Sequence, residues 1–114
     1  MAEVAELREA LREFARRRDW EQFHSPKNLA MAMSVEAAEL LEHFQWLTEQ
    51  QSRELPGPAR EEVAMEMADV FIYLLRLADQ LDVDLMRAAR DKMAINEQRY
   101  PVEQSRGKAG RPRD

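Results

Sequence analysis

Four acidic side chains occur in two pairs, each spaced i and i+3 within an apolar helical pattern. The segment "VEAAELLEHFQW" carries Glu36 and Glu39, and "MEMADVFIYLL" carries Glu66 and Asp69. At about 100° per residue, Glu36 lies about 60° from the middle of its apolar stripe, and Glu66 takes the equivalent flank of its own helix. Residues three apart on a helix are neighbours. Four carboxylates are therefore expected to meet in one cleft if the two helices pack side by side.

Carboxylates crowded into a partly buried cleft must be protonated or neutralised by cations. An all-oxygen ligand set suits Mg²⁺, with Mn²⁺ as a substitute. Because such ions bind phosphate oxygens and activate water, the acids predict hydrolysis at phosphorus. Two alternatives stay open. The acids could form the solvated rim of a non-catalytic, oligomeric helical interaction module, or belong to a carboxylate-bridged iron protein, although that design normally uses two Glu-x-x-His units.

Aromatic side chains near the acids are candidates for binding a flat ring. Trp20, Trp46 and Tyr73 could frame such a pocket, because base stacking contributes ~1–3 kcal/mol. The alternative is that these rings anchor the core or an interface. His24 follows Glu21 at i+3, for which a capping or surface role is the simpler interpretation. We nevertheless include His24 among the candidate substrate-binding residues.

Polar residues late in the chain could bind the rest of a nucleotide. Lys92, Asn96 and Arg99 are spaced i, i+4 and i+7, so they share one helix face and could donate to phosphate or sugar. A hydrogen bond within the bundle is the alternative for Asn96. Asn28 could add a donor at a helix N-terminus, and Tyr100 completes the candidate substrate-binding set.

Helical periodicity predicts four elements that must position these residues. They cover about residues 3–18, 26–50, 58–81 and 85–100. Ser25 is expected to cap the second helix with Pro26 in its first turn, and Asp82 or Asp84 to cap the fourth. No strand pattern is present. The chain is therefore predicted to be an all-α four-helix bundle, with one domain over residues 1–102 and a disordered tail over residues 103–114.

Composition limits the functional classes. The chain has 114 residues, a net charge of −5 and no cysteine. Its length predicts one domain, its charge does not favour nucleic acid, and the lack of cysteine excludes disulfides and thiolate metal sites. No apolar run approaches the ~20 residues of a membrane span. Without a signal-peptide pattern, a cytoplasmic location is expected. A chain of this size often gains stability by oligomerising.

Three blocks in a fixed order carry a resemblance to a known family. The segments "RDWEQFHSPKNLAMAMSVEAAELLEHFQW", "EEVAMEMADVFIYLLRLADQLDVDL" and "DKMAINEQRYP" resemble the MazG-like all-α nucleoside triphosphate pyrophosphohydrolases, and most of all their dCTP pyrophosphatase branch. The resemblance covers residues 7–102. It implies Mg²⁺-dependent cleavage of a nucleoside triphosphate, expected to be dCTP, a modified dCTP or another pyrimidine, to the monophosphate and pyrophosphate. It also implies nucleotide-pool house-cleaning by a homo-oligomer, a tetramer more than a dimer.

The resemblance also implies roles for individual residues. The metal-binding acids of the family fall on Glu36, Glu39, Glu66 and Asp69, the base-pocket aromatics on Trp20, Trp46 and Tyr73, and the phosphate and sugar contacts on Lys92 and Asn96. In the implied reaction an acid such as Glu39 acts as base, and Lys92 offsets developing charge. The chain has Val35 where many members of the family have an acid, which the dCTP branch also lacks. It also has Leu11 where the mammalian dCTP enzymes have a base-pocket histidine, so the reaction is better supported than the base.

Overall fold

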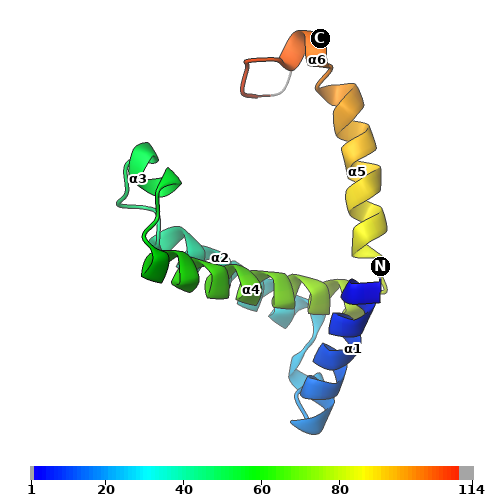
Figure 1. Cartoon of the computed structure of the whole chain (residues 1–114). Coiled ribbons are helices and arrows are strands. Elements are labelled where there is room, and N and C mark those ends of the chain that lie inside the picture. Colours follow the sequence, from blue (N-terminus) through cyan, green and yellow to red (C-terminus); the bar gives the residue numbers. More distant parts are fainter. Residues whose placement is uncertain (1, 111–114) are drawn as a thin grey trace. The chain divides into compact units, whose positions relative to one another are not determined.

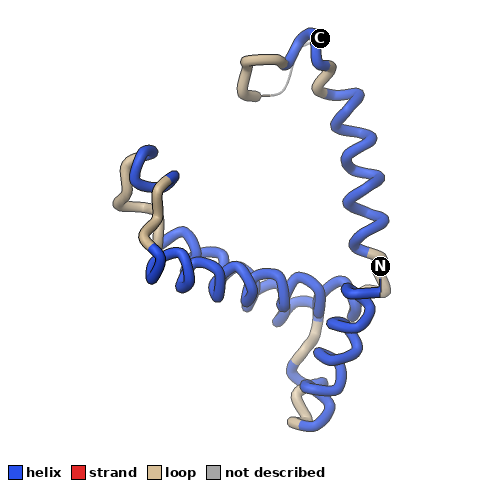
Figure 2. The backbone as a smooth tube through the Cα atoms, in the orientation of Figure 1, coloured by secondary structure: helices blue, strands red, loops and turns tan. Residues whose placement is uncertain are grey.

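A computed structural model describes residues 2–110, and every regular element in this range is a helix (Figures 1 and 2). The all-α prediction is confirmed. Within the same range, no helix combines the length and apolar character needed to cross a bilayer. In chain order the elements are α1 (Ala2–Arg17), the 3₁₀ turn η1 (Glu21–Phe23), α2 (Pro26–Glu42), α3 (Glu49–Arg53), α4 (Gly57–Gln80), α5 (Leu85–Arg99) and α6 (Val102–Ser105).

The chain divides into two units, Met1–Asp82 with α1 to α4 and Val83–Asp114 with α5 and α6. In the first unit α2 and α4 lie side by side and run antiparallel, and α1 packs against α4 (Figure 1). Among the described residues, the buried apolar residues all belong to this unit and come from α1, α2 and α4: Ala15, Leu29, Val63, Leu75 and Ala78. The four acids therefore lie on two helices, α2 and α4, that pack against each other.

Helix starts follow the capping residues read from the sequence. The Ser25 hydroxyl accepts the backbone N–H of Asn28 at 3.1 Å. The Asp84 carboxylate accepts the backbone N–H of Arg87 at 3.1 Å. Each bond satisfies a donor that the first turn of a helix would otherwise leave unpaired. The predicted cap at Ser25 is confirmed, and of the two candidates for the fourth helix, Asp84 is the one used.

The second helix is shorter than predicted, because α2 ends at Glu42 and not near residue 50. Thr48 starts a new helix instead. Its hydroxyl accepts the Gln51 N–H at 3.1 Å, and the Gln51 side chain accepts the Thr48 N–H at 2.9 Å. This reciprocal capping box favours a new N-terminus over continuation of the old helix. The acid pair of α2 consequently lies in its last two turns.

The C-terminal segment contains a short helix inside the tail that was predicted to be disordered. Val102–Ser105 form α6, which begins directly after Pro101. The expectation for residues 111–114 lies outside the described residues.

Candidate active site

Packing of α2 on α4 brings three of the four predicted acids together. One carboxylate oxygen from each of Glu36, Glu39 and Glu66 lies within 4.8 Å of the other two. Glu36 and Glu66 are half-buried, and Glu39 is exposed. The spacing is short enough for one divalent cation to contact all three side chains.

Asp69, the fourth predicted acid, lies outside this three-residue cluster and is exposed. It is one helical turn beyond Glu66 on α4, and it lines a pocket between α1 and α4. Its charge still reaches the cluster, because it contributes to the raised pKa of Glu36. Asp69 thus links the two regions, since it lies one turn from Glu66 and lines the pocket.

The electrostatics of the cluster call for a cation. The nearby Glu39 carboxylate, desolvation and the nearby Glu36 carboxylate together raise the pKa of Glu66 to about 8. The proximity of Glu66 lowers the pKa of Glu36, but the effects of Glu39 and of desolvation are larger in sum, so the pKa of Glu36 is raised. Glu36 Oε2 and Glu66 Oε1 are shielded from solvent and lack a hydrogen-bond partner. Unpartnered buried carboxylate oxygens are costly, and oxygen ligands of this kind suit Mg²⁺ or Mn²⁺.

A pocket of about 380 Å³ opens between α1 and α4, and of the four predicted acids Asp69 lines it. Its wall combines apolar side chains with a few polar groups, as is usual for small-molecule sites. The predicted residues Trp20, His24 and Tyr73 line it. The remaining lining residues are Leu11, Phe14, Ala15, Asp69, Ile72 and Arg76.

The end of α1 places Trp20 in this pocket. Asp19 adopts a left-handed conformation with φ 53°, which Asp tolerates better than most residues. The chain then turns back, and the Trp20 N–H donates to the Ala15 carbonyl at 2.9 Å. The Trp20 and Phe14 rings form a T-shaped pair with their centroids 5.8 Å apart, and the centroids of the Trp20 and His24 rings are 6.2 Å apart. These contacts hold the Trp20 ring against α1.

Two predicted substrate-binding residues do not line the pocket in the single chain. Trp46 lies in the turn after α2 and is 87% exposed. Asn28 is exposed, and its side-chain amide donates to the Phe23 carbonyl at 3.0 Å, so it supports the η1–α2 connection. Neither residue could be excluded from helical spacing alone.

The remaining predicted residues belong to the second unit. Lys92 and Asn96 lie within α5, Arg99 is its last residue, and Tyr100 is its C-cap. The Tyr100 N–H donates to the Asn96 carbonyl at 2.8 Å, which closes the helix. Contacts of these four residues with phosphate or sugar stay a prediction.

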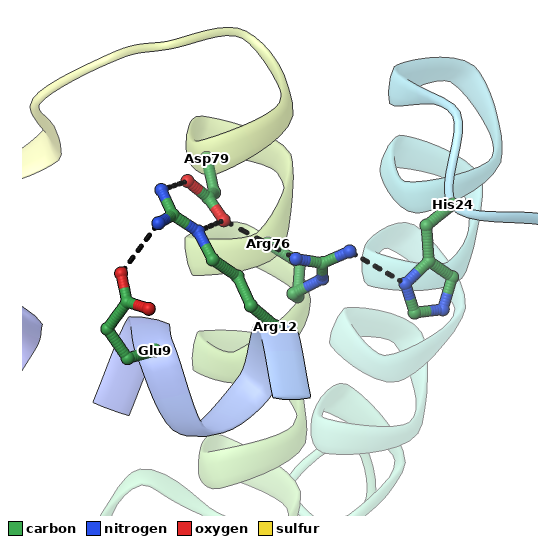
Figure 3. Close-up of polar contacts among 5 residues, drawn as sticks. All are labelled: Glu9, Arg12, His24, Arg76 and Asp79. Carbon is green, nitrogen blue, oxygen red and sulfur yellow. Dashed lines mark hydrogen bonds and ion pairs between the residues drawn. The ribbon is translucent and has the colours of Figure 1, made fainter. Parts of the chain in front are cut away.

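A charged network that was not predicted from the sequence reaches the pocket from α4 (Figure 3). Arg76 is only 4% exposed although it is charged. Its Nη1 contacts Asp79 Oδ2 at 3.4 Å, and its Nη2 contacts His24 Nδ1 at 3.3 Å. Arg12 of α1 donates to the Asp79 carboxylate from two nitrogens, Nε at 2.7 Å and Nη2, and it also donates to Glu9. The signal in the sequence was a lone arginine within "VFIYLLRLADQL".

His24 is therefore not the free surface histidine of the simpler interpretation. It caps η1 through its backbone, whose N–H donates to the Glu21 carbonyl at 3.2 Å. Its half-buried side chain lines the pocket and contacts Arg76. Its inclusion among the substrate-binding candidates stays a prediction, but its location is compatible with that role.

The chain has relatives among known proteins. A model of the MazG-like family matches residues 31–111. The chain is 45% identical to dCTP pyrophosphatase 1 of Mus musculus over 108 residues, which are 93% of this chain and 64% of that protein. Identity to dCTP pyrophosphatase 1 of Homo sapiens is also 45%, over 90% of this chain and 62% of the relative. The chain thus spans less than two thirds of the length of these relatives.

A solved structure has the same fold. The crystal structure of a pyrophosphatase from Archaeoglobus fulgidus superimposes with a TM-score of 0.82 and 44% sequence identity. The match covers 87% of this chain and 93% of the other.

Proposed function

Because the chain belongs to the MazG-like family, we propose that it is a divalent-metal-dependent nucleoside triphosphate pyrophosphohydrolase. The observation that carries the proposal is the three-acid cluster on α2 and α4, together with a pocket of about 380 Å³ that is lined by Asp69, one helical turn from Glu66. Asp69 connects the two, since it lines the pocket and its charge contributes to the raised pKa of Glu36. The relatives named as pyrophosphatases support the same reaction class.

The acid cluster fits a resident Mg²⁺ ion. Glu36, Glu39 and Glu66 would hold it, with Asp69 completing the ligand set from the next turn of α4. When bound, the ion stabilises negative charge on the phosphate oxygens as a Lewis acid. The two unpartnered oxygens of Glu36 and Glu66 then gain a partner, and the repulsion that raises their pKa values is relieved.

The chain's own residues would carry the proton transfer. Interactions with Glu66 and Glu36 lower the pKa of Glu39, so Glu39 is ionised at neutral pH. Its carboxylate accepts a proton from water as the water oxygen bonds to the α-phosphorus. The bond from this phosphorus to the bridging oxygen breaks, and pyrophosphate leaves with the electron pair. Lys92 is assigned to stabilise the departing charge.

The pocket would bind the base, with a pyrimidine such as dCTP or a modified dCTP as the proposed substrate. Trp20 and Tyr73 supply aromatic surface there. Trp46, at 87% exposure, is assigned to the same pocket in a homo-oligomer, in which a second copy covers it. The proposed oligomer is a tetramer rather than a dimer, and its size is measured directly by light scattering.

Trp20→Ala is expected to raise KM for the triphosphate by about 5- to 150-fold, the range that corresponds to ~1–3 kcal/mol of base stacking. The chemistry at phosphorus is remote from the ring, so kcat should change much less. Steady-state kinetics measure both constants. Phe23→Ala is the matched control, because Phe23 is an exposed aromatic close in sequence that is not among the pocket-lining residues. An unchanged KM in Trp20→Ala would place the base elsewhere.

The proposed function is tested by a panel of canonical and modified triphosphates with Mg²⁺ in water labelled with oxygen-18. We expect nucleoside monophosphate and pyrophosphate, with the label in the monophosphate, because attack at the α-phosphorus transfers the water oxygen there. Glu36→Gln should be inactive in parallel. Release of orthophosphate, label in the pyrophosphate, or no turnover of any member of the panel would overturn the proposal.

A further inference from the structure

Arg76 is held in one orientation by partners on both sides. Asp79, whose side chain is 8% exposed, contacts Arg76 and accepts hydrogen bonds from Arg12. Arg12 in turn binds Glu9, so two positive and two negative side chains alternate along the line (Figure 3). A buried guanidinium is costly unless it is paired. The charge balance accounts for the burial of Arg76, but not for its remaining contact with His24.

In the contact between Arg76 and His24, only Arg76 can be the hydrogen-bond donor. A guanidinium carries N–H donors and no acceptor, and it stays protonated in proteins. The Arg76 Nη2 to His24 Nδ1 contact at 3.3 Å therefore makes Nδ1 the acceptor. A neutral imidazole that accepts at Nδ1 carries its proton on Nε2. Arg76 thus selects one of the two neutral tautomers of His24.

The surroundings of His24 favour the neutral ring. Desolvation by burial lowers the pKa of His24, and the positive charge of Arg76 lowers it further. Both effects act against the doubly protonated form, in which Nδ1 would become a donor facing another donor. The tautomer set by Arg76 is consequently the form present near neutral pH.

We propose that Arg76 is a positioning residue that fixes His24 as the Nε2–H tautomer, so that His24 presents a single donor to an acceptor atom of the bound base. The inference rests on the proposed function, because it takes the pocket as the base site. Both residues line that pocket. Arg76 Nε is buried there without a partner, so the guanidinium has bonding capacity beyond its contacts with Asp79 and His24.

The Nε2–H tautomer determines which atoms of a base His24 can contact. An Nε2–H group pairs with a carbonyl oxygen or an unprotonated ring nitrogen, and the 2-carbonyl of a pyrimidine is such an acceptor. The α1 side of the pocket offers Leu11, Phe14 and Ala15, whose side chains cannot donate. His24 would therefore supply the donor that Leu11 cannot, from the segment between α1 and α2.

The tautomer can be read directly from the full chain. A long-range nitrogen-15 spectrum distinguishes protonated from unprotonated ring nitrogens, and the chain contains two histidines, His24 and His43. His43→Gln assigns the signals. About one unit above the ordinary histidine pKa of ~6.5, we expect His24 to be protonated at Nε2 and unprotonated at Nδ1. In Arg76→Met the two tautomers should mix. A wild-type His24 protonated at Nδ1, or an even mixture, would overturn the assignment even if Arg76→Met does not fold.

Two substitutions of His24 distinguish binding of the base from a purely structural contact with Arg76. His24→Gln places an amide donor near the Nε2 position but moves the acceptor away from Arg76. His24→Asn keeps an acceptor near the Nδ1 position and loses the Nε2–H donor. We expect KM for dCTP to rise at least about tenfold in His24→Asn, the value of one hydrogen bond of ~1.4 kcal/mol, and to rise less in His24→Gln.

A purely structural histidine predicts the reverse order, because His24→Asn would then keep the contact that matters. That order would overturn the role of His24 in recognition. Absence of triphosphate hydrolysis by the wild-type protein would instead overturn the proposed function, while the nitrogen spectrum would still decide whether Arg76 fixes the tautomer.

Discussion

Glu66→Gln is expected to lower kcat for triphosphate hydrolysis by more than about 100-fold, since losses of 10- to 100-fold are typical even for residues that only support a metal ligand. Gln has nearly the same shape but no charge. The substitution would weaken binding of the cation, because it removes one of three carboxylates. Oxygens of these three residues, Glu36, Glu39 and Glu66, lie within 4.8 Å of one another. Circular dichroism should show unchanged helicity, because Glu66 is not one of the buried residues that join the helices.

The matched control is Glu61→Gln, which removes an exposed acid from the same helix outside the cluster. Its kcat should stay close to that of the wild type. Full activity in Glu66→Gln, or equal losses in both variants, would show that the cluster is not the catalytic metal site.

Stability in a chelator is expected to fall as the pH rises from about 4.5 to about 8. The folded protein holds a proton on Glu66 with a pKa of about 8, against an ordinary value of 4.5. The folded state therefore binds more protons than the unfolded state in this window, and folding becomes less favourable as they are lost. Glu36 acts in the same direction, whereas the lowered pKa of Glu39 acts in the opposite one.

Mg²⁺ should reverse this loss by binding the ionised cluster. At a hundredfold excess over Kd a ligand adds about 2.7 kcal/mol to the free energy of unfolding, which is roughly 10 °C or more in Tm for a domain of this size. Thermal melts at roughly pH 5 and pH 8, with chelator or Mg²⁺, measure the effect. Glu66→Gln should lack most of the pH-dependent loss and most of the gain from Mg²⁺. Equal Mg²⁺ stabilisation in both proteins would contradict the assignment and leave a solvated acidic rim as the better explanation.

Local features of the sequence were enough to predict much of the fold. Ser25 and Asp84 were recognisable as caps because their partners lie three residues away. The meeting of Glu36 with Glu66 could be predicted because both occupy the same flank of an apolar stripe. The break after Glu42 was missed, since the competing capping box at Thr48 was not weighed against helical periodicity.

The pocket could be predicted only in part, because its contacts join residues that are distant in sequence. Arg76 meets His24 across 52 residues, and Arg12 meets Asp79 across 67. Spacing along one helix does not reveal such pairs. Spacing also cannot show that Trp46 falls in a turn with 87% of its surface exposed.

Anomalous diffraction from crystals of the wild-type protein soaked in Mn²⁺ tests the central claim most directly. We predict a manganese peak within ligand distance of carboxylate oxygens of Glu36, Glu39 and Glu66, with Asp69 at the same ion or at a neighbouring one. Crystals of Glu66→Gln grown and soaked in the same way should show a much weaker peak. A cluster that stays empty while manganese binds other carboxylates, or a peak of equal height in the variant, would contradict the account.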